Sequence, residues 1–106
     1  MILEITMRHF LSLFLIAAFL LSCAKEAKAQ IVEASCGQCQ FDMIDEAGCD
    51  LAVRIDGQTY FVDNSSIDDH GDAHAEDGLC NTIRKAKVTG DIAEGRFKSN
   101  SFELIH

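Results

Sequence analysis

Two pairs of side chains in this sequence have the types and the spacing of metal ligands. Cys36 and Cys39 are separated by two residues, so both sulfurs can turn toward one ion. His70 and His74 are separated by three residues, a spacing that places both imidazoles on one face of a helix. We therefore expect one Cys₂His₂ site that is built from the two pairs and holds zinc (Zn) or copper (Cu). The gap between the pairs matches no zinc-finger spacing, so the fold has to bring them together.

Two further cysteines, Cys49 and Cys80, are candidates for a disulfide between a hairpin and a helix. Together with Cys36 and Cys39 they make an even number, as a disulfide framework in a small exported domain requires. The same four cysteines also allow one Cys₄ metal site, two disulfides, or a redox-active pair at Cys36 and Cys39. The sequence does not decide between these uses of the four cysteines.

An uncharged segment near the beginning of the chain indicates export. Residues 10–21 (FLSLFLIAAFLL) are too short to span a bilayer comfortably and are typical of the apolar core of a signal peptide. Glu4 and Arg8 cancel in the segment before it, whereas a start at Met7 would leave a basic segment without an acid. We therefore expect Met7 to be the true start.

The residues after the apolar segment predict lipidation. Leu-Leu-Ser-Cys23 resembles a bacterial lipobox, in which Cys23 becomes the lipidated first residue. An A-x-A site that ends at Ala29 is the alternative for ordinary secretion. We expect a signal peptide at residues 1–22, a lipid-anchored tether at 23–30 and one domain at 31–106. This organisation predicts a protein of the bacterial cell envelope that is held on a membrane through its lipid.

The domain is expected to be α+β and rich in β-structure. Asp56-Gly57 between two alternating runs is the clearest hairpin signal. The expected strands are 30–35, 51–55, 59–62, 88–92 and 97–105, and a helix is expected at 73–86. The order strand, strand, strand, helix, strand, strand resembles that of the five-stranded OB-type barrel.

Composition restricts the function. The chain has 17 acidic and 9 basic residues and a net charge of −8, which argues against nucleic acid and favours a metal ion or a basic protein as partner. No catalytic motif occurs, so we do not expect an enzyme. The leading hypothesis is a small metal-binding domain. The alternatives are a disulfide-stabilised binding module and a thiol–disulfide redox protein.

Several short motifs resemble those of one family of small exported bacterial proteins. They are Cys36-Gly-Gln-Cys-Gln-Phe41, Gly48-Cys-Asp-Leu-Ala-Val53, Tyr60-Phe-Val-Asp63 and Asp68-Asp-His-Gly-Asp-Ala-His74. The resemblance covers about residues 34–104. The family is a domain of unknown function, so the resemblance implies that the cysteines and histidines belong to one domain and implies no activity.

Overall fold

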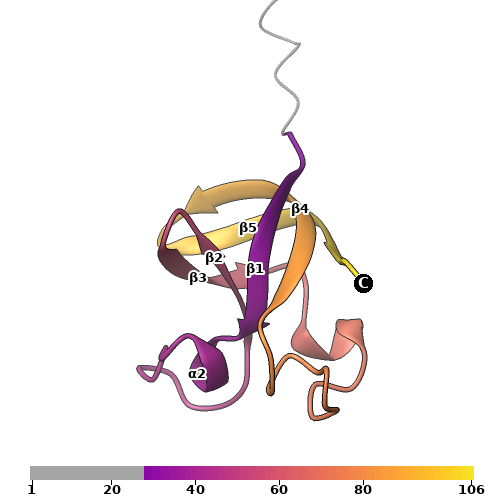
Figure 1. Ribbon diagram of the computed structural model, residues 1–106. Coiled ribbons are helices and arrows are strands. Elements are labelled where there is room, and N and C mark those ends of the chain that lie inside the picture. The colour runs from indigo at the N-terminus through magenta and orange to yellow at the C-terminus, as the bar shows by residue number, and fades with distance from the viewer. Residues whose placement is uncertain (1–27) are drawn as a thin grey trace, which may run out of the picture.

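The computed structural model describes residues 28–106 (Figure 1). The expected signal peptide, the start at Met7 and the lipidation site at Cys23 lie outside the described residues, as does most of the expected tether. None of the helices within residues 28–106 is long and apolar enough to cross a membrane.

The described residues form a closed five-stranded barrel in which the strands follow the order β1-β2-β3-β5-β4. All neighbouring strands are antiparallel except β3 and β5, which are parallel. The elements are β1 (Gln30–Cys36), α2 (Gly37–Gln40), β2 (Leu51–Ile55), β3 (Gln58–Asp63), the 3₁₀ helix η1 (Ile67–His70), β4 (Arg84–Ala93) and β5 (Arg96–Leu104). The expected β-rich, OB-like architecture is confirmed, including a short helix between β3 and β4.

Two hairpins form because their turns are encoded locally. Asp56 and Gly57 join β2 to β3 with φ of 51° and 81°, the two positive values that a type I′ turn requires. Glu94 and Gly95, with φ of 56° and 73°, join β4 to β5 in the same way. These turns set the register that sends alternate side chains into the barrel.

The core of the barrel is small and continuous. Phe97 and Leu79 are its largest fully buried side chains, with 0% and 1% of their surface exposed. The remaining members are Val32, Ala34, Cys36, Leu51, Val53, Val62, Ile67, Ala73, Ala86 and Val88. Cys36 belongs to this core, so the first candidate ligand lies where the barrel interior meets its end.

The prediction of a helix at 73–86 is wrong. Residues 73–82 form a series of turns in which the Cys80 amide donates to the Ala73 carbonyl at 2.9 Å. Gly78 makes this fold-back possible, since a Cβ there would lie 2.3 Å from the Ala73 carbonyl oxygen. The last part of the expected helix is instead the beginning of β4, where Ala86 pairs with Val32 of β1.

One end of the barrel collects the long connections. In Figure 1, α2 with the loop after it and the segment between β3 and β4 lie together below the strands. The β1–β2 connection spans residues 37–50 and the β3–β4 connection spans residues 64–83. The motifs that carry cysteine and histidine all lie in or next to these two connections.

Candidate metal centre

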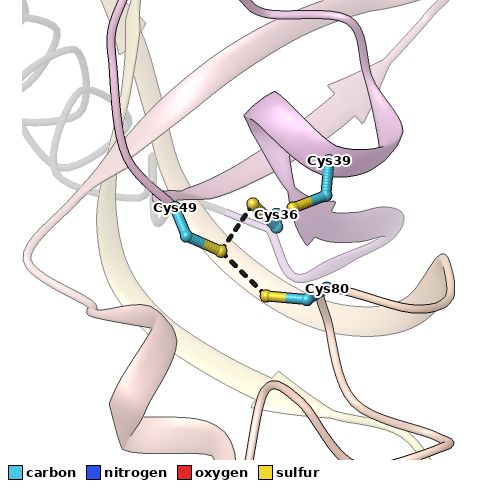
Figure 2. A group of neighbouring side chains, drawn as sticks. All are labelled: Cys36, Cys39, Cys49 and Cys80. Atoms are coloured by element: carbon cyan, nitrogen blue, oxygen red, sulfur yellow. Dashed lines mark hydrogen bonds between the residues drawn. The ribbon is translucent and has the colours of Figure 1, made fainter.

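Four cysteines from three segments converge at this end of the barrel (Figure 2). Cys36 is the last residue of β1, Cys39 lies on α2, Cys49 precedes β2, and Cys80 lies in the β3–β4 connection. Their sulfur atoms all lie within 4.8 Å of one another, and all four are free cysteines. A group of this size can hold a metal ion.

Cys49 is the central member of the group. Its Sγ lies 2.7 Å from the Sγ of Cys36 and 2.8 Å from the Sγ of Cys80, the two contacts drawn as dashed lines in Figure 2. Cys36 is fully buried, Cys49 and Cys80 are half-buried, and Cys39 is exposed. The cluster is therefore anchored in the core on one side and reaches solvent on the other.

The residues between the cysteines of the first motif fix the β1–β2 connection. The Gly37 amide donates to the Asp50 carbonyl at 2.8 Å, which closes the connection and places Cys49 beside β1. The Gln38 side chain accepts from the Asp50 amide at 2.9 Å and donates to the Asp50 carboxylate at 2.8 Å. Residue 37 has to be glycine, because a Cβ would lie 2.7 Å from Cε1 of Phe61.

A second set of hydrogen bonds fixes the segment that carries Cys80. The Cys36 amide donates to the Leu79 carbonyl at 2.9 Å, and the Gln40 side chain donates to the Cys80 carbonyl at 3.0 Å. The buried Ser35 hydroxyl lies 2.6 Å from the Leu79 carbonyl oxygen and 2.9 Å from that of Thr82. Side chains from β1 and α2 thus hold the third segment against the first.

The protonation of the cluster is uneven. Burial raises the pKa of Cys36, but the thiols of Cys49 and Cys39 and the backbone amides of Cys39 and Gln38 outweigh it, so that the pKa falls below 9.0. The hydrogen bond to Cys36 and then desolvation raise the pKa of Cys39 to about 11. Burial and the hydrogen bonds to Cys36 and Cys80 raise the pKa of Cys49.

Deprotonation is therefore most favourable at Cys36, whose thiolate would accept hydrogen bonds from the thiols of Cys39 and Cys49. Each further thiolate would lie beside a like charge, which is unfavourable. A cation bound among the sulfurs would remove that repulsion and favour deprotonation of the whole set. The electrostatics therefore suit a cation.

The two histidines are not members of the sulfur cluster. The Nε2 of His70 lies 2.7 Å from the Ser65 hydroxyl, and its ring packs against Phe102 with centroids 4.9 Å apart. Burial lowers the pKa of His70, and the charge of Asp69 partly opposes this. His70 lines a groove of about 700 Å³ whose lining includes no cysteine among the described residues. His74 has 85% of its side chain exposed.

The structure thus brings together Cys36 and Cys39 of the expected ligand set, but joins them to Cys49 and Cys80 in place of the imidazoles. The two candidates for a disulfide are members of the same cluster as free cysteines. The alternative in which all four cysteines share one site fits this geometry. The even cysteine count was the signal for it, since nothing in the local sequence of Cys80 indicates a ligand.

The fold and the site define a small OB-type β-barrel with a four-cysteine cluster at one end. Residues 30–105 match the family of unknown function DUF6370, and the chain belongs to this family. The expected membership in such a family is therefore confirmed. No curated protein and no solved structure matches the chain. The function has to be argued from the site.

Proposed function

We propose that this protein is an exported metal-binding domain of the cell envelope. Cys36, Cys39, Cys49 and Cys80 would hold one Zn²⁺ or Cu⁺ ion as thiolates. The observation that carries the proposal is the convergence of four sulfur atoms from three separate segments within 4.8 Å. The proposed role is binding and not catalysis.

The spacing of the sulfurs supports a single ion. Four sulfurs about 2.3 Å from one Zn²⁺ in a tetrahedron would lie about 3.8 Å apart. The separations within the cluster range from 2.7 Å to no more than 4.8 Å, so shifts of about 1 Å would produce a tetrahedron. Soft thiolate ligands select Zn²⁺ and Cu⁺, and these are the two ions that we propose.

The arrangement favours a metal over two disulfides. A disulfide framework assigns each cysteine one partner, whereas Cys49 contacts both Cys36 and Cys80 at nearly equal distances. A disulfide-stabilised module that uses its acidic loops to bind a basic protein remains the second candidate, supported by the charge of −8. A thiol–disulfide redox protein is the third.

Metal analysis and a thiol count on one sample test the proposal. The full chain is purified from the envelope in detergent without chelator. We expect one ion per chain, and four thiols that react with an alkylating agent once the ion is removed under denaturing conditions. Absence of an ion, together with a gain of about 4 Da on reduction, would favour two disulfides and refute the proposal.

Histidine variants serve as the matched control. His70→Asn and His74→Asn should leave the ion content unchanged, because neither ring lies in the sulfur cluster. Cys49→Ser should abolish loading, because Cys49 contacts two of the other sulfurs. Loss of the ion in either histidine variant would contradict the four-thiol set.

We also propose export and lipid attachment through Cys23. The support is the apolar run at residues 10–21 followed directly by Leu-Leu-Ser-Cys23. The exported protein should incorporate a radiolabelled fatty acid and sediment with membranes, and Cys23→Ser should do neither. A wild-type protein that is soluble, with Gln30 as its first residue, would show ordinary secretion after Ala29.

A further inference from the structure

The four candidate ligands differ in how firmly the fold holds them. Cys36 is buried in the barrel core, and Cys49 and Cys80 are partly buried and pack against that core. Cys39 is the exposed member. It lies on α2, a helix of four residues whose N-cap has no side-chain hydrogen bond. Three ligands thus lie in or against the core, and Cys39 is the one that solvent reaches directly.

We infer that Cys39 is the exchangeable ligand of the centre, through which the bound ion passes to or from a cationic acceptor that carries a thiol. This inference rests on the proposed function, since it requires an ion at the four sulfurs. Cys36, Cys49 and Cys80 would keep the ion while Cys39 leaves. The site is then one for transfer and not only for structural support.

The transfer step is a ligand exchange that leaves all oxidation states unchanged. The thiolate of the acceptor forms a sulfur–metal bond as the Cys39 sulfur–metal bond breaks. The Cys39 thiolate takes up the proton that the acceptor thiol has released. Further acceptor thiolates then replace the remaining three, and each freed cysteine takes up one proton.

The charge around the cluster restricts which acceptor approaches. Neither connection at this end of the barrel contains Lys or Arg, and every acidic residue in them is exposed. These residues, here called the acidic rim, are Asp42, Asp45, Glu46, Asp50, Asp68, Asp69, Asp72, Glu76 and Asp77. An acidic surface raises the local concentration of cations and repels anions. We therefore assign the acceptor to thiols in cationic surroundings.

The lack of Lys and Arg within the two connections also favours departure of one thiolate. Four thiolates around Zn²⁺ carry a net charge of −2, and around Cu⁺ a net charge of −3. In both connections the neighbouring charged side chains have the same sign. Loss of one thiolate ligand lowers this repulsion. Cys39 is the ligand that can leave without opening the core.

The first experiment labels the loaded wild-type chain. The protein is purified with its ion and treated with a limiting amount of iodoacetamide, and the modified cysteine is identified by peptide mass spectrometry. We expect Cys39 to react first, while the ion remains bound in the singly modified chain. Earlier modification of Cys49 or Cys80, or release of the ion with the first modification, would overturn the inference.

The second experiment uses two small thiols that differ in charge on the same two-carbon scaffold. Cysteamine is cationic and 2-mercaptoethanesulfonate is anionic, and they are compared at equal thiolate concentration with the loaded wild-type chain. Loss of the ion should be about 10-fold faster with cysteamine at low ionic strength. The ratio should approach one at about 1 M salt, where the Debye length is about 3 Å. Equal rates at low salt would overturn the assignment of a cationic acceptor.

A variant pair separates this inference from the proposed function. Cys39→Ser should still take up one ion and lose it faster to either thiol, whereas Cys80→Ser should fail to load. A wild-type chain that binds no ion refutes the proposed function itself. A wild-type chain that binds an ion, but in which Cys39→Ser and Cys80→Ser lose loading equally, refutes only the role of Cys39.

Discussion

Removal of the Ser35 hydroxyl should loosen the metal centre without touching a ligand. Ser35 is fully buried, and its hydroxyl lies 2.6 Å from the Leu79 carbonyl oxygen and 2.9 Å from that of Thr82. In Ser35→Ala the Leu79 carbonyl keeps the Cys36 amide as donor, so mainly the Thr82 carbonyl loses a partner. Loss of a hydrogen bond that leaves a buried acceptor unpaired costs about 1–3 kcal/mol. We expect the free energy of unfolding to fall by about that amount.

The same substitution should weaken ion binding, because Leu79 and Thr82 flank the segment that carries Cys80. Urea denaturation of the ion-free, reduced protein measures the first effect, and competition with a chelator measures the second. Ser101→Ala is the matched control. Its hydroxyl pairs with that of Thr89 on the exposed side of the hairpin, so the change in unfolding free energy should stay below about 0.5 kcal/mol. If the Ser35 and Ser101 variants behave alike, Ser35 does not position the Cys80 segment.

Three further predictions concern packing and protonation. Gly37→Ala should lower the unfolding free energy by about 1–3 kcal/mol in denaturant titrations, because the new Cβ would meet the Phe61 ring; unchanged stability would contradict this packing. Because the pKa of His70 is lowered in the folded state, the free energy of unfolding should fall as the pH drops below 6.5. His70→Gln should lose this pH dependence. Parallel pH profiles of wild type and variant would show that His70 does not cause it. The folded ion-free protein holds protons on Cys39 and Cys49 that the unfolded chain releases, so its stability should decline as the pH rises from 9.0 toward about 11. The protein with its ion bound lacks these protons, so its stability should not show this decline. An equal loss of stability above pH 9.0 in the ion-bound and ion-free proteins would contradict the pKa assignment.

The parts of the fold that follow from local chemistry were predictable from the sequence. The turn at Asp56-Gly57 fixes a hairpin through two consecutive residues with positive φ. The strands on both sides of the turn could therefore be predicted. The turn at Glu94 and Gly95, which also has two positive φ values, fixes the hairpin of β4 and β5 in the same way. Register and strand order in the barrel depend on pairing between distant segments. In the sequence, the only indication of them was the order of the expected elements, which resembles that of an OB-type barrel.

The helix expected at 73–86 shows that part of a burial pattern can be predicted correctly while the backbone conformation is predicted wrongly. Leu79 and Ala86 are buried as their helical spacing required, and Ile83 is partly exposed at 37%. The turns bury Leu79 through a fold-back that needs Gly78, and β4 buries Ala86 by pairing with β1. A short apolar spacing does not separate these solutions, because tertiary pairing overrides weak helix propensity.

The proposed metal site likewise depends partly on local sequence and partly on contacts between distant segments. Cys36 and Cys39 form one side of it because two residues separate them, and this was readable from the sequence. Cys49 and Cys80 are 13 and 44 positions beyond Cys36, and only the closed barrel places them against it. The spacing of His70 and His74 was an equally good signal in the sequence, but it required a helix that contains both residues. The structure has only a 3₁₀ turn there, and this turn ends at His70.

The five residues Cys36-Gly-Gln-Cys-Gln40 therefore carry more than two ligands. The glycine leaves room for the Phe61 ring beneath the turn, Gln38 closes the connection that delivers Cys49, and Gln40 bonds the segment that delivers Cys80. Gln38 and Gln40 thus each hold a different segment that carries another cysteine. A motif that served only as a disulfide pair would not need side chains directed at two other cysteine-bearing segments. These contacts within five residues support the proposal that all four thiols act together, because they bring the three cysteine-bearing segments to one place.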